Sequence, residues 1–169
     1  LGDIDGFRHV DLTVSQSEIF PGPHFSNTEY LSFAGENPGV IARTGTARGQ
    51  HAEVRAAYSL DGGETWTAFA TEPPDCAGSG SIAVSADGTT FVWTPLHGTP
   101  RFTVDFGTKW TACAGLSTGL AVVADPVNAR RFYACDSRAG KLFVSTNGAA
   151  GFSATAPGFP RVENFGAGF

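Results

Sequence analysis

The sequence has no methionine, only three cysteines, few charged residues and no long apolar run. Charged residues make up 16% of its 169 positions, the formal net charge is −5, and Lys and Arg form no cluster. A surface for nucleic acid or anionic lipid is therefore not expected. No apolar run approaches the ~20 residues that a membrane-spanning helix needs, so the sequence predicts no membrane span.

Helical periodicity is also absent, because no window places apolar residues at intervals of 3.6 positions. What the sequence has instead is 22 glycines and 14 phenylalanines. This composition favours many short strands joined by tight turns. The sequence therefore predicts an all-β fold.

The three cysteines are Cys76, Cys113 and Cys135. Their spacing differs from that of zinc ligands, and we expect neither a metal nor a cofactor. An odd number leaves at least one cysteine unpaired. Either one disulfide forms or the cysteines are buried free thiols, and the spacing does not decide between the two.

Three stretches follow one pattern: "YSLDGGETWTAF", "FTVDFGTKWTAC" and "FVSTNGAAGFSA". In each, a hydroxyl residue precedes an Asp or Asn and an aromatic residue follows it. The copies are about 43 residues apart, which is typical of repeat architectures. Between them lie strand–turn–strand stretches such as "IAVSADGTTFVWTP". Each unit then has four antiparallel strands, which is the size of one β-propeller blade.

The residues of this pattern suit the framework of a turn. An Asp or Asn oxygen accepts backbone N–H groups of its own turn, and glycine supplies a positive φ. In the third copy Asn147 replaces the carboxylate, which keeps the acceptor oxygen but would end any catalytic role. We predict a structural role for the whole set: Ser59, Asp61, Gly63, Trp66, Asp105, Gly107, Trp110 and Asn147.

These copies resemble the Asp-box (BNR) repeat of sialidases, sortilin-like receptors and several glycosidases. The resemblance implies about three to four blades of an incomplete propeller, over residues 27–169. Because a propeller needs about four to eight blades to close, we expect a slice of a larger propeller, or one of several chains that complete a ring. Residues 1–26 are predicted to form a separate segment that lines a cleft.

The stretch "LGDIDGFRHVDLTVSQ" at the start does not fit the blade pattern. Its carboxylates and basic groups either face water in a loop or form a site. Phe7 and His9 offer flat faces on which a sugar ring could stack, and Arg8 lies between them. Two residues further along are also candidates for binding substrate. Asn27 either orients sugar hydroxyls or caps a turn, and Trp93 is either a stacking platform or a core residue.

Within this stretch, "GDIDGFRHVDL" resembles the segment "GDIGGFRHxDL" of glycoside hydrolase family 74, the xyloglucanases. The resemblance continues through "FSNTEYLSFAGENPGVIARTG" and "VVADPVNARRFYACDS" and covers nearly the whole chain. It implies two seven-bladed propellers that face each other across a cleft, with this chain in the start and middle of the second. The partners of the chain would then be its remaining blades and the first propeller.

The resemblance also implies a secreted enzyme that hydrolyses the β-1,4-glucan backbone of xyloglucan with inversion. Endo action is the leading interpretation, and exo action stays open because the residues do not decide between the two. Asp3 matches the position of the general acid, and the general base would lie in the first propeller, outside this chain. The sequence departs from the family pattern at Asp5, where the family has Gly. We expect the second carboxylate to disturb Asp3, so that Asp5→Gly leaves activity intact or raises it.

Two other functions remain open from the residues. A propeller module without activity that binds a glycan or a protein is compatible with Asp-box turns, because enzymes and receptors both carry them. A sialidase would need an arginine cluster and a tyrosine nucleophile. The tyrosines here lie in stretches that are predicted strands, which makes a sialidase the less favoured alternative.

Overall fold

The computed structural model describes residues 5–47 and 54–155, and within them the chain forms twelve strands and no helix. The strands make three four-stranded antiparallel sheets, each from four consecutive strands. Blade 1 contains β1 (Phe25–Phe33), β2 (Ile41–Ala47), β3 (Ala56–Ser59) and β4 (Thr67–Ala68). Blade 2 contains β5 (Ser81–Val84), β6 (Phe91–Thr94), β7 (Arg101–Thr103) and β8 (Thr111–Ala112). Blade 3 contains β9 (Val122–Ala124), β10 (Phe132–Asp136), β11 (Lys141–Ser145) and β12 (Ser153–Ala154). The predicted all-β propeller blades are confirmed.

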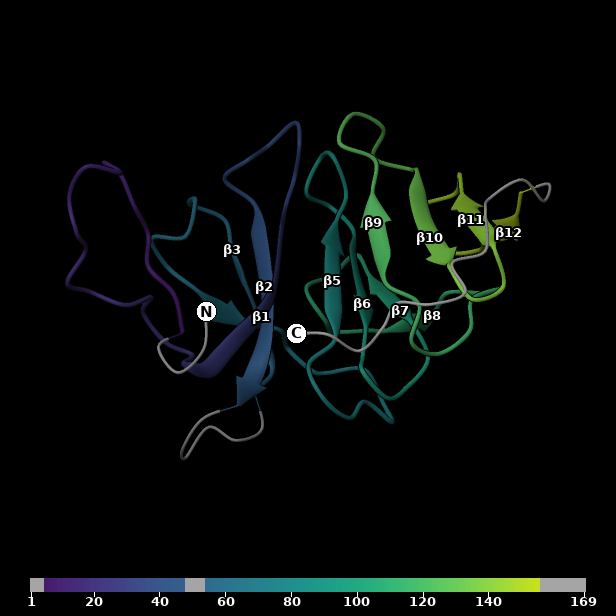
Figure 1. The fold of residues 1–169 in the computed structure, drawn as a ribbon, viewed down its shortest axis with the longest axis horizontal. Helices are drawn as coiled ribbons and strands as arrows, with labels where there is room; N and C mark the ends of the chain where they lie inside the picture. The colour runs from purple at the N-terminus through teal and green to yellow at the C-terminus, as the bar shows by residue number, and fades with distance from the viewer. Residues whose placement is uncertain (1–4, 48–53, 156–169) are drawn as a thin grey trace.

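The first strands of the three blades, β1, β5 and β9, lie next to one another (Figure 1). Ser32 Oγ of β1 accepts a hydrogen bond from the N–H of Val84 in β5 (3.1 Å), while the Glu29 side chain contacts Ser79, just before β5. From the second of these contacts to the first, the residue number rises along both segments, from Glu29 to Ser32 and from Ser79 to Val84. The strands β1 and β5 therefore run parallel. The connections that lead into the first strands therefore meet at one end of the blades.

Two apolar cores fill the spaces between the blades, where the facing surfaces of adjacent sheets are apolar. The core between blades 1 and 2 contains Ala34, Val40, Ala42, Ala56, Phe69, Ile82, Val84, Phe91, Trp93 and Trp110. The core between blades 2 and 3 contains Ala83, Val92, Cys113, Val122, Phe132, Ala134, Ala149 and Phe152. The three blades thus stack side by side, as the blades of a propeller do.

A third apolar cluster lies on the other face of blade 1. It joins Phe20 of the N-terminal segment to Phe25, Ala57 and Trp66 of the blade. The rings of Phe20 and Trp66 are 5.2 Å apart. The N-terminal segment is thus packed against blade 1, and β1 begins at Phe25, just inside the stretch 1–26 that the sequence analysis separated from the blades.

The three Asp-box turns, which join the third and fourth strands of each blade, share one hydrogen-bond pattern. In the first, the Ser59 hydroxyl donates to Asp61 (2.7 Å) and accepts from the N–H of Gly63 (2.8 Å). Asp61 in turn accepts the N–H of Thr65 (2.9 Å). The equivalent bonds of the second turn involve Thr103, Asp105, Gly107 and Lys109. Those of the third turn involve Ser145, Asn147, Ala149 and Gly151.

The third turn keeps this geometry with less suitable residues. Ala149 has a φ of 70°, at the position where Gly63 and Gly107 have φ values of 88° and 86°. A residue with a Cβ is strained there. The Ala149 methyl group is fully buried in the core between blades 2 and 3, and its packing offsets part of that strain.

All three cysteines are free. Cys113 is buried, Cys76 is half-buried and Cys135 is exposed. Burial raises the pKa of the Cys113 thiol to about 12 and that of Cys76 to about 11. Of the two alternatives for the cysteines, the structure therefore shows free thiols, of which only one is fully buried.

Candidate active site

Asp5 is buried where the N-terminal segment meets blade 1, with 1% of its surface exposed. Its carboxylate forms an ion pair with Arg43 of β2 and accepts a hydrogen bond from Thr28 Oγ1 (3.1 Å). His24 Nδ1 lies 3.3 Å from the second carboxylate oxygen. The backbone of Asp5 also forms a parallel bridge with Asn27 of β1. Main chain and side chain together fix this point of the segment to the blade.

The partner of Asp5, Arg43, is completely buried in an aromatic cage. Its guanidinium carbon lies 4.7 Å from the ring centre of Phe20, 4.8 Å from Phe25 and 4.3 Å from Trp66. Cations are attracted to the faces of aromatic rings at such distances, more strongly when water is excluded. Arg43 therefore joins the N-terminal segment, β1 and the first Asp-box turn.

Burial lowers the pKa of Arg43 to about 10, and the charge of Asp5 partly offsets this effect. Arg43 therefore stays protonated at neutral pH. Its Nη2 also donates to the carbonyl of Pro23 (2.9 Å). Since an unpaired buried charge is strongly unfavourable, the burial of the Arg43 charge depends on Asp5 and on this carbonyl contact.

The structure changes what is expected of Asp5, the position at which the sequence departs from the family pattern. Asp5 has a φ of 57°, in the region that Gly favours and Asp tolerates better than most residues. Replacement with Gly would suit the backbone but would leave the Arg43 guanidinium without its carboxylate. The expectation that Asp5→Gly is harmless omitted this ion pair, because Arg43 was not identified from the sequence.

Beyond Asp5, the N-terminal segment closes on itself and on the first Asp-box turn. The N–H of Phe20 donates to the carbonyl of Gly6 (2.8 Å). Arg8 Nε donates to the carbonyl of Gly62 (3.2 Å), and Arg8 Nη2 lies 3.0 Å from the carboxylate of Glu64. The charge of Arg8, a predicted substrate ligand, is thus paired with the turn of blade 1.

Phe7 and His9 lie together on this segment, with ring centres 6.5 Å apart and planes at 63°. Phe7 is half-buried and His9 is exposed. The Asp5 bridge brings Asn27 to the same region. Asp3, the predicted general acid, lies outside the described residues, two positions before this anchored point.

Trp93, in contrast, presents no surface to a ligand. It is fully buried, its Nε1 donates to the carbonyl of Ser79, and its ring packs 5.9 Å from that of Trp110. The stacking-platform alternative for Trp93 is therefore wrong in this structure, and the core alternative describes it.

Sequence reasoning missed Arg43, because it lies in a stretch that was treated only as a blade strand. The available signal was the charge of Arg43 within the strand stretch "VIARTG". A charged residue in a strand whose neighbours are apolar indicates a buried partner elsewhere.

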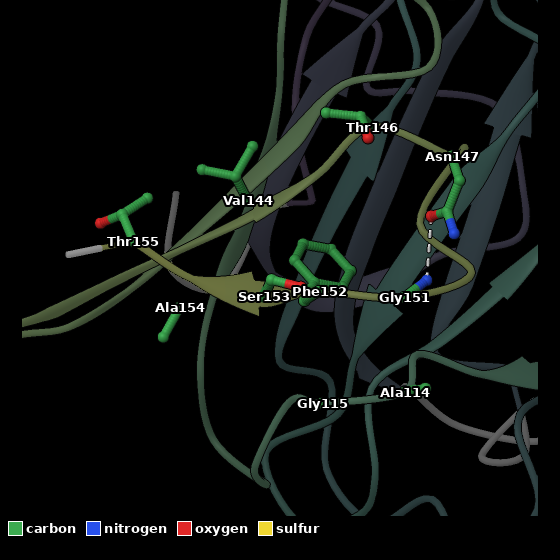
Figure 2. Close-up of a pocket in the computed structure, with 10 residues that line it drawn as sticks. All are labelled: Ala114, Gly115, Val144, Thr146, Asn147, Gly151, Phe152, Ser153, Ala154 and Thr155. Atoms are coloured by element: carbon green, nitrogen blue, oxygen red, sulfur yellow. Dashed lines mark hydrogen bonds between the residues drawn. The ribbon is translucent and has the colours of Figure 1, made fainter.

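A hollow lies at the third Asp-box turn (Figure 2). It has a volume of about 500 Å³, and Val144, Asn147, Gly151 and Phe152 are among its lining residues. The Asn147 side chain is bonded to the N–H of Gly151. None of the described residues that line it has an ionisable side chain, so they offer this hollow no group for acid–base chemistry.

Within residues 5–47 and 54–155, no group of His, Cys, Asp and Glu side chains is arranged to hold a metal ion. The same part of the chain has no helix of the length and apolarity that a membrane crossing requires.

Comparison with known proteins gives a consistent result. A scan against models of protein families finds no match. A xyloglucanase of a Paenibacillus species is 38% identical over 92% of this chain and 15% of its own length. A xyloglucanase of Acetivibrio thermocellus is 34% identical over 97% of this chain and 19% of its own length.

Solved structures agree with these relatives. The crystal structure of a family 74 xyloglucanase from Xanthomonas campestris matches 90% of this chain and 22% of its own chain, with a TM-score of 0.85 and 46% identity. The chain thus spans 15–19% of the length of the two curated relatives above. Because sequence and structure agree over nine tenths of the chain, it is a segment of a glycoside hydrolase family 74 protein.

Proposed function

We propose that this segment supplies the general-acid half of the active site of a secreted, inverting endo-β-1,4-glucanase that cleaves the backbone of xyloglucan. The observation that carries the proposal is the similarity to proteins named xyloglucanases over more than 90% of the chain. The stretch "GDIDGFRHVDL" adds Asp3, one of the two carboxyl groups that such chemistry needs. The remaining blades and a facing propeller would complete the protein.

The proposed reaction needs two carboxyl groups on opposite sides of the glycosidic bond. Asp3 donates its proton to the glycosidic oxygen as the C–O bond breaks. A carboxylate of the facing propeller takes a proton from water, whose oxygen attacks the anomeric carbon from the other side. Inverting enzymes hold the two groups about 6.5–9.5 Å apart to make room for this water.

The described residues support the part of this scheme that concerns position. Asp5 is fixed to β1 and to Arg43, and two peptide units limit the distance from its Cα to that of Asp3 to about 7.6 Å. The general acid would therefore lie within two residues of an anchored point of the chain, and precise placement of catalytic groups needs such support. Phe7 and His9 lie on the same segment, where a sugar ring could contact them.

The test compares Asp3→Asn with Asp11→Asn in the full-length protein. Asp11 is an exposed carboxylate of the same segment whose partner is Thr13, so it serves as the matched control. Loss of a general acid should lower kcat on xyloglucan by about 10²- to 10⁴-fold, while Asp11→Asn should change it little.

The loss should be much smaller on an aryl glycoside whose leaving group needs no proton. Equal losses on both substrates would contradict the general-acid role of Asp3. Normal turnover of xyloglucan by Asp3→Asn would exclude Asp3 from the chemistry. A wild-type protein that binds glycans without cleaving them would favour the binding module instead.

A further inference from the structure

A second concave site lies between blades 1 and 2, and we call it the β1–β5 cavity. Its volume is about 250 Å³. The walls that matter here come from β1 (Glu29 and Tyr30), from Gly80 at the start of β5, and from Thr94 and Leu96 at the end of β6. Two adjacent blades and their connections thus build one hollow.

The cavity lies close to the anchored N-terminal segment. Asp5 bridges to Asn27, and Tyr30 is three residues further along the same strand. At about 3.3 Å per residue, Tyr30 is about 10 Å from that bridge. Since β1 and β5 run parallel, the cavity is on the side of the blades where the chain enters its first strands. A chain-like ligand that lies along the N-terminal segment could therefore reach it.

The walls combine apolar surfaces with one charged group. The Tyr30 side chain is 48% exposed and that of Leu96 is 60% exposed. Glu29 is held by the hydroxyls of Thr46 (2.7 Å) and Ser79, and it is the only ionisable acid or base among the lining residues apart from the Tyr30 phenol. An oriented carboxylate accepts hydrogen bonds from hydroxyl groups and repels anions.

Thr94 adds a polar group to the same wall. It is 3% exposed, and its hydroxyl has no hydrogen-bond partner within the described part of the chain. Buried hydroxyls in native proteins are normally satisfied, which makes Thr94 an unusual polar residue in this wall, although its hydroxyl lies below the surface. A half-exposed tyrosine beside hydrogen-bonding groups is suited to a ring with one apolar face and polar edges.

We propose that the β1–β5 cavity is a subsite for one neutral sugar unit, which packs against the Tyr30 ring and donates a hydroxyl hydrogen bond to Glu29. The proposal rests on the proposed function, because it takes that unit to be part of the same xyloglucan chain. Glu29 then makes the subsite selective for neutral sugars over uronic acids.

The experiment measures oligosaccharide binding by calorimetry in the full-length protein carrying Asp3→Asn, which should slow cleavage during the measurement. The probes are a xyloglucan oligosaccharide and a glucuronic-acid-containing oligosaccharide of similar length. Tyr30→Ala should weaken binding of the neutral probe by about tenfold or more, whereas Tyr30→Phe, which keeps the ring, should change it less than threefold. Leu31→Ala is the matched control, because Leu31 is a neighbour on β1 with similar exposure, 49%, that does not line this cavity.

Glu29→Gln tests the charge and provides a second variant if Tyr30→Ala fails to fold. This variant should weaken binding of the neutral probe several-fold and reduce the preference for the neutral over the acidic probe. Unchanged binding of the neutral probe by folded Tyr30→Ala, or an unchanged preference in Glu29→Gln, would overturn the subsite.

Hydrolysis by the wild-type protein separates this proposal from the proposed function. Normal hydrolysis with Tyr30-independent binding would overturn only the subsite. Tyr30-dependent binding without hydrolysis would support the subsite and contradict the proposed catalysis. Absence of both binding and hydrolysis would overturn both.

Discussion

Asp5 shows how one residue can be misjudged when its partner is distant in the sequence. From the sequence it is an extra carboxylate beside Asp3, at a position where the family has Gly. In the structure it is the counterion of Arg43, 38 residues away. Such an ion pair could not be predicted, because nothing local in either stretch specifies the other.

The buried pair leads to a prediction on stability. In the full-length protein, Asp5→Gly should lower the free energy of unfolding of this domain by about 3–5 kcal/mol, because it leaves the Arg43 guanidinium buried without a carboxylate. The double variant Asp5→Gly with Arg43→Met should recover most of this loss, since methionine can fill the aromatic cage. Denaturant unfolding measures both. A single variant as stable as wild type would show that the pair contributes nothing to the fold.

The Asp-box turns are the elements that the sequence predicts best. Their hydrogen bonds join residues two to four positions apart, so the pattern of hydroxyl, Asx and aromatic residues contains the information that forms them. The packing of the N-terminal segment on blade 1 was not predicted, because it depends on the long-range contacts of Phe20, Trp66 and Arg43. Whether Trp93 is a stacking platform or a core residue was left open for the same reason.

The first of these turns gives a prediction on pH. The hydrogen bond from the Thr65 hydroxyl is the largest of the contacts that lower the pKa of Asp61 to about 2, whereas an unfolded Asp titrates near 3.9. The carboxylate therefore stabilises the fold above about pH 4, and this contribution is lost as the pH falls through about 2. Asp61→Asn should fold, as the third turn does with Asn147, but its stability should fall less steeply between pH 4 and 2.

Urea unfolding of the full-length protein between pH 2 and 7 measures this slope. Asn147→Asp is the converse variant, and its stability should fall more steeply than that of wild type over the same acidic range. If both variants have the pH profile of wild type, the Asx side chains of these turns are not coupled to folding.

At the scale of the whole molecule, the repeat predicted the architecture and the N-terminal stretch predicted the family. Three blades with adjacent first strands are present in the described residues. The β1–β5 cavity was not foreseen, because its walls come from segments that meet only when blades 1 and 2 pack together. The proposed chemistry likewise needs a second carboxylate from a domain that faces this one.

The most direct test of this account is the configuration of the sugar first released from xyloglucan by the full-length protein, followed by proton NMR. An inverting cleavage of a β-1,4 linkage gives the α-anomer at the new reducing end, and the β-anomer then grows in slowly by mutarotation. The account predicts this order. Initial release of the β-anomer would contradict the inverting mechanism, and the absence of any new reducing end would contradict the proposed glucanase.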